Sequence, residues 1–348
     1  MLNADNKESI HTDKGTVLIL ILLIITVLTV TIMESMHLMQ VETLSSRIYQ
    51  QSFQSKSLAK SGTAIAKFLL LQDKIDDEEE EESSDHCGEP WGKFPKNEKI
   101  PTPELDSGKY NGTITDEQSK FPINHLVTEN GEYQKSYKNI LFRLLRREPF
   151  ALEDTQAKKI LQGIKDWIDN DNSPTGEFGA EKNYYLSKKT GYSCPNSLIT
   201  SLSELRLIRG INNKIYNGNK EQAGLKDLLT VYSNGKININ TAPKPLLSAM
   251  VKPTVNKETA KEFAKKMLDY RRDRTHYDFL SESDWYRNRM AGYNDIQLPG
   301  NIVTTKSSYF SVNINGIKGE YSTSRYIILK RKQKDGKIKL KTLFTEVR

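Results

Sequence analysis

The N-terminal apolar run constrains the fold of this 348-residue chain more than any other feature. Residues 16–33 contain no charge, proline or glycine, and Glu34 ends the run. At ~1.5 Å rise per residue such a helix is ~27 Å long, close to the ~30 Å hydrocarbon thickness of a bilayer. Apolar residues then continue at helical spacing, and no proline or glycine occurs between Thr16 and Ser61. The pattern predicts one helix over residues 16–72, transmembrane at 16–33 and amphipathic afterwards.

Three interpretations of this N-terminus compete. A secretory signal peptide would have a shorter apolar core and a small-residue cleavage site behind it, whereas here the helical pattern continues. A plain single-span anchor explains the hydrophobicity alone. The third interpretation rests on Lys14 and Gly15, directly before the apolar run, which resemble the class III signal of type IV pilins and pseudopilins. This resemblance implies that residues 1–15 are a leader, that a prepilin peptidase cuts after Gly15, and that Thr16 becomes the methylated N-terminus.

Charge and one departure from the pilin pattern refine this interpretation. Lys7, His11 and Lys14 precede the span, which predicts a cytoplasmic leader and an exported body. Major pilins carry Glu at the fifth mature position, where this chain has Leu20. In that family the Glu pairs with the N-terminal amine of the subunit above, and an unpaired charge within hydrocarbon costs at least ~2.5–3.5 kcal/mol. A subunit with nothing above it has no use for this Glu, so Leu20 points to a fibre tip.

The composition fits a soluble body carried on this anchor. The mean hydropathy is −0.61 and the formal net charge is +7. Lys and Arg are spread along the chain, which favours a solvated basic surface over a nucleic-acid or lipid site. Cys87 and Cys194 occur without a CxxC motif or clustered His, so a zinc site is unsupported. An exported body permits a disulfide between these two cysteines, and the sequence does not decide whether it forms.

Two separated segments predict a small antiparallel sheet. Residues 110–127 contain short alternating runs and a turn signal at Asn111 and Gly112, typical of strand–turn–strand. Residues 308–348 predict a three-stranded meander. Its strands are expected at 309–315, 324–331 and 338–344. Before the sheet, residues 73–108 are irregular, and the like-charge run at 76–85 is expected to form an exposed loop.

Helical periodicity dominates the region between these segments. Apolar residues at helical spacing predict helices at 140–145 and 160–168, and shorter ones at 226–232, 245–251 and 257–272. We therefore expect an α+β fold. A pilin-like antiparallel sheet domain, formed by residues 109–128 and 306–348, is carried by the long N-terminal helix. Residues 129–305 form a large inserted α-helical domain.

Six motifs in order resemble one family, the type II secretion minor pseudopilin K, also called general secretion pathway protein K. The first is the prepilin junction without Glu at the fifth mature position. The other five are residues 114–124, residues 165–171 together with 179–185, and residues 203–211, 237–243 and 308–310. The long acidic run and Pro122 depart from the family pattern and affect loop detail. The resemblance implies a place at the tip of the periplasmic pseudopilus, in complex with minor pseudopilins I and J and alongside other pseudopilus subunits.

A carboxylate-rich segment follows the second predicted helix. Its five members lie within sixteen residues: Asp166, Asp169, Asp171, Glu177 and Glu181. Calcium takes six to eight oxygen ligands, which such a turn can supply. Pro174 stands where an EF-hand loop needs Gly, so the segment is no EF-hand. We expect a structural Ca²⁺, which the family resemblance also implies; a capped, solvated turn is the alternative.

Residues 202–211 support a second hypothesis about function. A helix entering a Gly-Ile turn resembles a helix-hairpin-helix, which holds DNA phosphates through backbone N–H groups. Arg206, Arg209, Lys214 and Lys220 would add positive charge. However, Asn212 and Asn213 replace the usual Gly, and the body is expected to be exported. We therefore favour a protein-contact unit and expect no nucleic-acid partner.

No sequence motif indicates an enzyme, because GxSxG, HExxH and Gly-rich phosphate loops are absent and the five His are scattered. The sequence predicts a single-pass inner-membrane minor pseudopilin with a periplasmic body, which starts or caps the pseudopilus during protein export. The alternatives are a DNA- or surface-binding minor pilin of a type IV pilus or competence system, and an inert membrane-anchored calcium-binding domain. The last alternative leaves the Gly15 junction unexplained.

Overall fold

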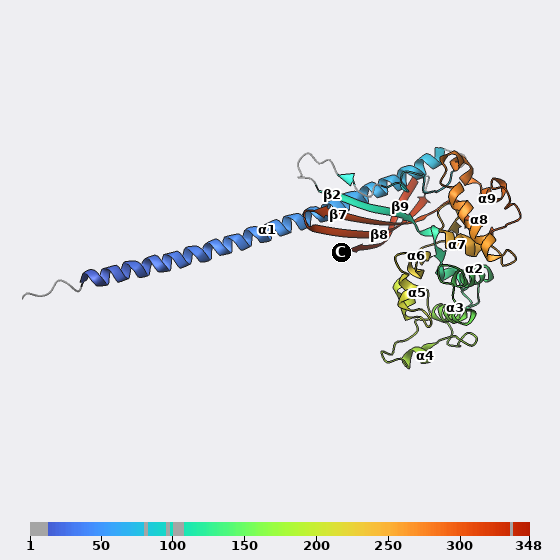
Figure 1. Ribbon diagram of the computed structural model, residues 1–348, viewed down its shortest axis with the longest axis horizontal. Coiled ribbons are helices and arrows are strands. Elements are labelled where there is room, and N and C mark those ends of the chain that lie inside the picture. Colours follow the sequence, from blue (N-terminus) through green and yellow to red (C-terminus); the bar gives the residue numbers. More distant parts are fainter. Residues whose placement is uncertain (1–12, 80–82, 95–97, 100–107, 335–336) are drawn as a thin grey trace, which may run out of the picture.

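The computed structural model describes residues 13–79, 83–94, 98–99, 108–334 and 337–348. A long helix, α1 (Asp13–Glu79), extends from a body of one sheet and several helices (Figure 1). Residues 15–50 of α1 are exposed, and their apolar part is long enough to cross a membrane. The helix ends seven residues later than the predicted residue 72, inside the acidic run.

A five-stranded antiparallel sheet packs on the C-terminal half of α1. Its strand order is β1 (Glu98–Lys99), β2 (Lys109–Asp116), β7 (Tyr309–Lys318), β8 (Tyr321–Lys334) and β9 (Lys337–Val347). Ala66 and Leu70 of α1 are buried against Tyr110 and Phe310. A Cβ at Gly62 would lie 2.8 Å from atoms of both Tyr110 and Ile314, so glycine lets the helix approach the sheet closely.

The C-terminal meander is confirmed, but the predicted strand–turn–strand at 110–127 is wrong. Asn111 and Gly112 lie inside β2, opposite Asn315 and Ile314 of β7. A Cβ at Gly112 would lie 2.3 Å from the Asn313 carbonyl oxygen, so this glycine serves close strand packing and forms no turn. The chain then leaves the main sheet. A two-residue strand, β3 (Phe121–Pro122), pairs in parallel with β4 (Leu229–Thr230).

The region between β2 and β7 is largely helical and has its own buried core. Its helices are α2 (Lys135–Arg146), α3 (Asp154–Ile168), α4 (Lys182–Leu186), α5 (Asn213–Asn217), α6 (Leu225–Leu228), α7 (Lys244–Met250), α8 (Lys257–Tyr270) and α9 (Trp285–Asn288). A short parallel pair joins β5 (Ile237–Asn238) to β6 (Val303–Thr304). Figure 1 shows this helical region at the end of the molecule opposite the start of α1. The predicted α+β fold with an inserted helical domain is confirmed.

Candidate functional site

The predicted cleavage junction lies on an isolated part of α1. Gly15 is exposed, and a Cβ built there would meet no atom within 4 Å. Thr16 begins the exposed apolar run. No other described segment covers this junction.

The end of α3 and the following loop bring three of the five predicted calcium ligands together. Asp166 lies in the last turn of α3, Asp169 caps that helix, and Glu181 precedes α4. One oxygen from each carboxylate lies within 4.8 Å of the others, and all three residues are buried. We call Asp166, Asp169 and Glu181 the loop cluster.

Several oxygens of the loop cluster lack a donor. Asp166 accepts hydrogen bonds from the backbone N–H groups of Thr175, at 3.0 Å, and Ala180. Lys165 Nζ pairs with Asp169 Oδ2. Asp169 Oδ1 and both carboxylate oxygens of Glu181 are buried without a hydrogen-bond partner. Unpaired buried acceptors are costly, so a cation bound by oxygen atoms would complete this arrangement.

The pKa shifts describe the same excess of negative charge. Burial, followed by the charges of Asp166 and Asp169, raises the pKa of Glu181 to about 7. Burial also raises the pKa of Asp169, although Lys165 opposes this shift. A divalent cation would favour the ionised carboxylates and reverse both effects. The donor set therefore fits calcium.

The other two predicted ligands lie differently. Asp171 is exposed, and its Oδ1 accepts a hydrogen bond from the Ser173 N–H at 2.7 Å. Its charge still raises the pKa of Glu181, which places it at the edge of the loop cluster. Glu177 is exposed and lies outside the cluster. Sequence spacing could not distinguish Glu177 from Glu181, because the direction of each side chain depends on the loop conformation.

The helix-hairpin-helix of the second, less favoured hypothesis does not form. Residues 202–207 are a 3-10 helix and α5 spans five residues, so no pair of α-helices frames the glycine turn. Asn212 instead caps α5 by accepting a hydrogen bond from the Ile215 N–H at 2.9 Å. Arg209 Nη1 donates to the Gly179 carbonyl at 3.0 Å. Arg209 thus holds the acidic loop.

The two cysteines are not bonded in the structure. Cys87 is exposed in the segment after α1, whereas Cys194 is buried in the helical region. Cys194 Sγ lies 3.2 Å from the Asp166 carbonyl oxygen. The sequence left open whether these cysteines form a disulfide, and in the structure both are free thiols.

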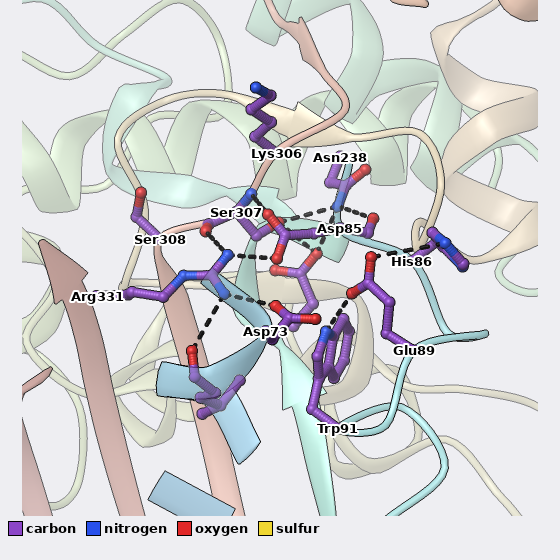
Figure 2. Close-up of polar contacts among 12 residues, drawn as sticks. Asp73, Asp85, His86, Glu89, Trp91, Asn238, Lys306, Ser307, Ser308 and Arg331 are labelled. Atoms are coloured by element: carbon purple, nitrogen blue, oxygen red, sulfur yellow. Dashed lines mark hydrogen bonds and ion pairs between the residues drawn. The ribbon is translucent and has the colours of Figure 1, made fainter. Parts of the chain in front are cut away.

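A second group of carboxylates, which sequence reasoning missed, lies where α1, the sheet and the helical region meet (Figure 2). Asp73, Asp85 and Glu89 each place one oxygen within 4.8 Å of the others. We call them the junction cluster. Arg331 of β8 pairs with Asp73 at 2.7 Å and also with Asp85. Asp85 was expected in an exposed acidic loop, and that expectation is wrong, because Arg331 neutralises it inside the protein.

Hydrogen bonds extend the junction cluster into the helical region. Asp85 Oδ2 accepts from the Ser307 N–H at 2.6 Å. Asn238 Nδ2 donates to the Asp85 carbonyl at 2.9 Å and to Asp116 Oδ2 at 3.0 Å. Figure 2 shows Arg331, Asp85, Ser307 and Asn238 converging from different elements. The network therefore fastens the helical region to the end of α1 and to the sheet.

Protonation completes the charge balance of the junction cluster. Burial, followed by the charge of Asp73, raises the pKa of Glu89 to about 10. Burial, followed by the charge of Asp85, raises the pKa of Asp73 to about 6, although Arg331 opposes this shift. Glu89 and Asp73 share a side-chain hydrogen bond, which requires a proton on one of them. We assign this proton to Glu89, because Asp73 is paired with Arg331.

Comparisons with known proteins agree with this architecture. A family model described as Type II secretion system (T2SS), protein K matches residues 119–220. Type II secretion system protein K of Pseudomonas aeruginosa is 29% identical over 241 residues, covering 68% of this chain and 67% of that protein. The protein of the same name from Aeromonas hydrophila is 26% identical over 271 residues, covering 74% of each chain.

A solved structure shares the fold. The match is to the crystal structure of the GspK-GspI-GspJ complex from the enterotoxigenic Escherichia coli type 2 secretion system. The TM-score is 0.60 at 18% identity, covering 88% of this chain and 99% of the matched chain. The solved structure supports the fold, while the family model and the relatives from two other organisms show that the chain is similar to type II secretion system protein K and support a minor pseudopilin of type II secretion.

Proposed function

We propose that this minor pseudopilin forms the tip of the pseudopilus, where it starts or caps the fibre together with minor pseudopilins I and J. The observation that carries this proposal is the position of the large helical region. The helical region lies at the end opposite the apolar start of α1 (Figure 1). A subunit added above would have to pass this region, while subunits below can pack against the exposed part of α1.

The proposal includes processing and location. A prepilin peptidase cuts between Gly15 and Thr16 and the new N-terminus is methylated, which the exposure of this junction allows. The apolar run then anchors the mature chain in the inner membrane, with the body in the periplasm. Leu20 supports the tip position, because a terminal subunit has no amine above it to neutralise a carboxylate.

We also propose a structural Ca²⁺ at the loop cluster. Asp166, Asp169 and Glu181 would be its carboxylate ligands, and the charge of Asp171 acts on the same site. The three buried oxygens without donors support this assignment. The ion would fix the loop after α3. The function is one of assembly, and no catalytic step or nucleic-acid partner is proposed.

Co-purification tests the tip proposal. The full-length chain would be expressed with minor pseudopilins I and J of the same organism, extracted in detergent and analysed by size exclusion with light scattering. We expect a complex with one copy of each subunit and a mature chain that begins at Thr16 by mass spectrometry. Absence of a complex, both with calcium and with chelator, would contradict the tip proposal, and a chain retaining residues 1–15 would contradict the processing step.

A further inference from the structure

A basic pocket lies among α2, α7 and α8, apart from both carboxylate clusters. Its volume is about 250 Å³. The basic residues that line it are Arg146, Arg147, Lys244, Lys257 and Lys261. Only two carboxylates, Glu148 and Glu258, share this lining. The pocket therefore carries an excess of three positive charges.

Two of the five basic side chains pair with a carboxylate. Lys261 Nζ lies 2.9 Å from Glu148, and Arg146 lies 3.7 Å from Glu153, which is outside the pocket. Across the part of the chain that the structure describes, the remaining three form no ion pair with a carboxylate. These three are Arg147, Lys244 and Lys257.

Arg147 is held rigidly although its charge is not neutralised. It is 8% exposed, and its Nη1 donates to the Ser248 carbonyl near the end of α7. One helical turn earlier, Arg143 donates to the Ala249 carbonyl at 2.7 Å. Burial, followed by the charge of Arg147, lowers the pKa of Arg143 to about 10. Two guanidinium groups thus donate to carbonyls at the same end of α7, which offer partial charges and no full negative charge.

We propose that this pocket binds the terminal phosphate of a small phosphorylated ligand. A phosphate monoester carries about −1.5 to −2 charge and three acceptor oxygens, which match one guanidinium and two ammonium groups better than a single carboxylate does. A nucleic-acid backbone would instead need a row of cations along an extended surface. Here the cations gather in one concave pocket.

The position of the pocket makes it accessible. Its helices lie at the end of the molecule opposite the apolar start of α1 (Figure 1). A ligand can therefore enter without approaching the bilayer that α1 would span. Three sources share the required chemistry: inorganic phosphate, a phosphorylated sugar and a glycerophosphate headgroup. The proposal does not depend on the tip position in the pseudopilus.

Calorimetric titration of the full-length chain in detergent tests this proposal. The probes are inorganic phosphate, glucose 1-phosphate and glycerol 3-phosphate, and the tightest of them identifies the source. We expect saturable binding that weakens about tenfold or more in the double variant Lys244→Glu, Lys257→Glu, because two charge-assisted contacts are lost. The matched control is Lys265→Glu, Lys266→Glu, which changes the net charge equally at exposed positions of α8 outside the pocket. The control should bind like the wild type.

Arg147→Lys gives an independent measure, because it keeps the charge but removes the planar fork. We expect weaker phosphate binding in this variant, with a normal thermal unfolding curve confirming that it folds. The proposal is overturned if none of the three probes binds saturably, or if both double variants lose binding equally. Tighter binding of a glutamate-rich peptide than of any phosphate probe would also overturn it, and would assign the pocket to an acidic protein segment.

Discussion

The junction cluster and the loop cluster each gather three carboxylates within the same short range, yet they are neutralised in different ways. In the junction cluster, Arg331 pairs with Asp73 and Asp85, and neighbouring backbone and side-chain donors bind the remaining oxygens. In the loop cluster, Lys165 reaches only Asp169. Three oxygens there have no donor.

This difference separates two uses of buried negative charge. The junction cluster is closed by a cation of the chain itself, so its stabilising effect requires no solute. The loop cluster is incomplete without a cation from solution. The first joins α1, the sheet and the helical region without any solute, whereas the proposed Ca²⁺ would make the loop after α3 depend on the metal concentration around the protein.

Removal of the internal cation should have the largest effect. Arg331→Met leaves Asp73 and Asp85 buried without their partner, which typically costs ~3–5 kcal/mol. We expect the free energy of unfolding, measured by urea titration of the full-length chain in detergent, to fall by about this amount. Lys332→Met is the matched control, because Lys332 is exposed on the same strand. Equal stability of the two variants would show that the junction cluster does not hold the domains together.

Calcium removal should have the next largest effect, and only on the loop cluster. At a calcium concentration about 100 times its dissociation constant, binding stabilises the folded state by ~2.7 kcal/mol. We expect a chelator to lower the unfolding temperature and to speed amide hydrogen exchange in residues 162–181. Exchange in β7 and β8, beside the junction cluster, should not change. An identical unfolding temperature with calcium and with chelator would contradict the calcium proposal.

A pair of isosteric variants sharpens the ligand assignment. Glu181→Gln removes a buried charge whose pKa is raised, so we expect this variant to be at least as stable as the wild type in chelator. It should gain much less stability than the wild type when calcium is added, a deficit of about 1–2 kcal/mol if affinity falls about ten- to thirtyfold. Glu177→Gln is the control, since Glu177 is exposed and outside the cluster. If both variants respond to calcium like the wild type, Glu181 is not a ligand.

The sequence predicted those elements of the fold whose conformation is decided by residues close together in the chain. The apolar run of α1, the alternation of the C-terminal meander and the helical periods of α2, α3 and α8 all appear as expected. Local pattern also located the acidic loop, because its five carboxylates lie close together in the chain. In contrast, Gly112 was misassigned to a turn, since its strand partner Ile314, more than two hundred residues later, decides its role.

The junction cluster could not be predicted for the same reason. Arg331 is separated by 258 residues from Asp73 and by 246 from Asp85. Asp85 belongs to a like-charge run that favours solvent, and Arg331 belongs to an alternating basic strand. No local property of the sequence marks these two residues as partners, and only the packing of α1 and the segment after it against β8 brings them together.

The smallest effect concerns the proton in the junction cluster. The pKa of Glu89 is about 10 in the folded protein, chiefly through burial, while an unfolded chain leaves it near 4.5. Protonated Glu89 therefore contributes stability that is complete below about pH 4.5 and is lost as the pH rises toward 10. Asp73, Asp85, His86 and Arg331 surround this group, and none of them is substituted in the comparison below.

Glu89→Gln removes the titration while keeping an acceptor for Trp91 Nε1 and a donor for Asp73. Between pH 6 and pH 8, we expect the free energy of unfolding of the wild type to fall by about 1 kcal/mol relative to that of the variant. One proton accounts for at most ~1.4 kcal/mol per pH unit, and local relaxation reduces this value. Urea unfolding at several pH values measures the difference. Glu89→Asp, which keeps a titratable group, should retain the pH dependence. Parallel curves for the wild type and Glu89→Gln would mean that Glu89 is already ionised, and Arg331 would then have to neutralise three carboxylates without the help of a proton.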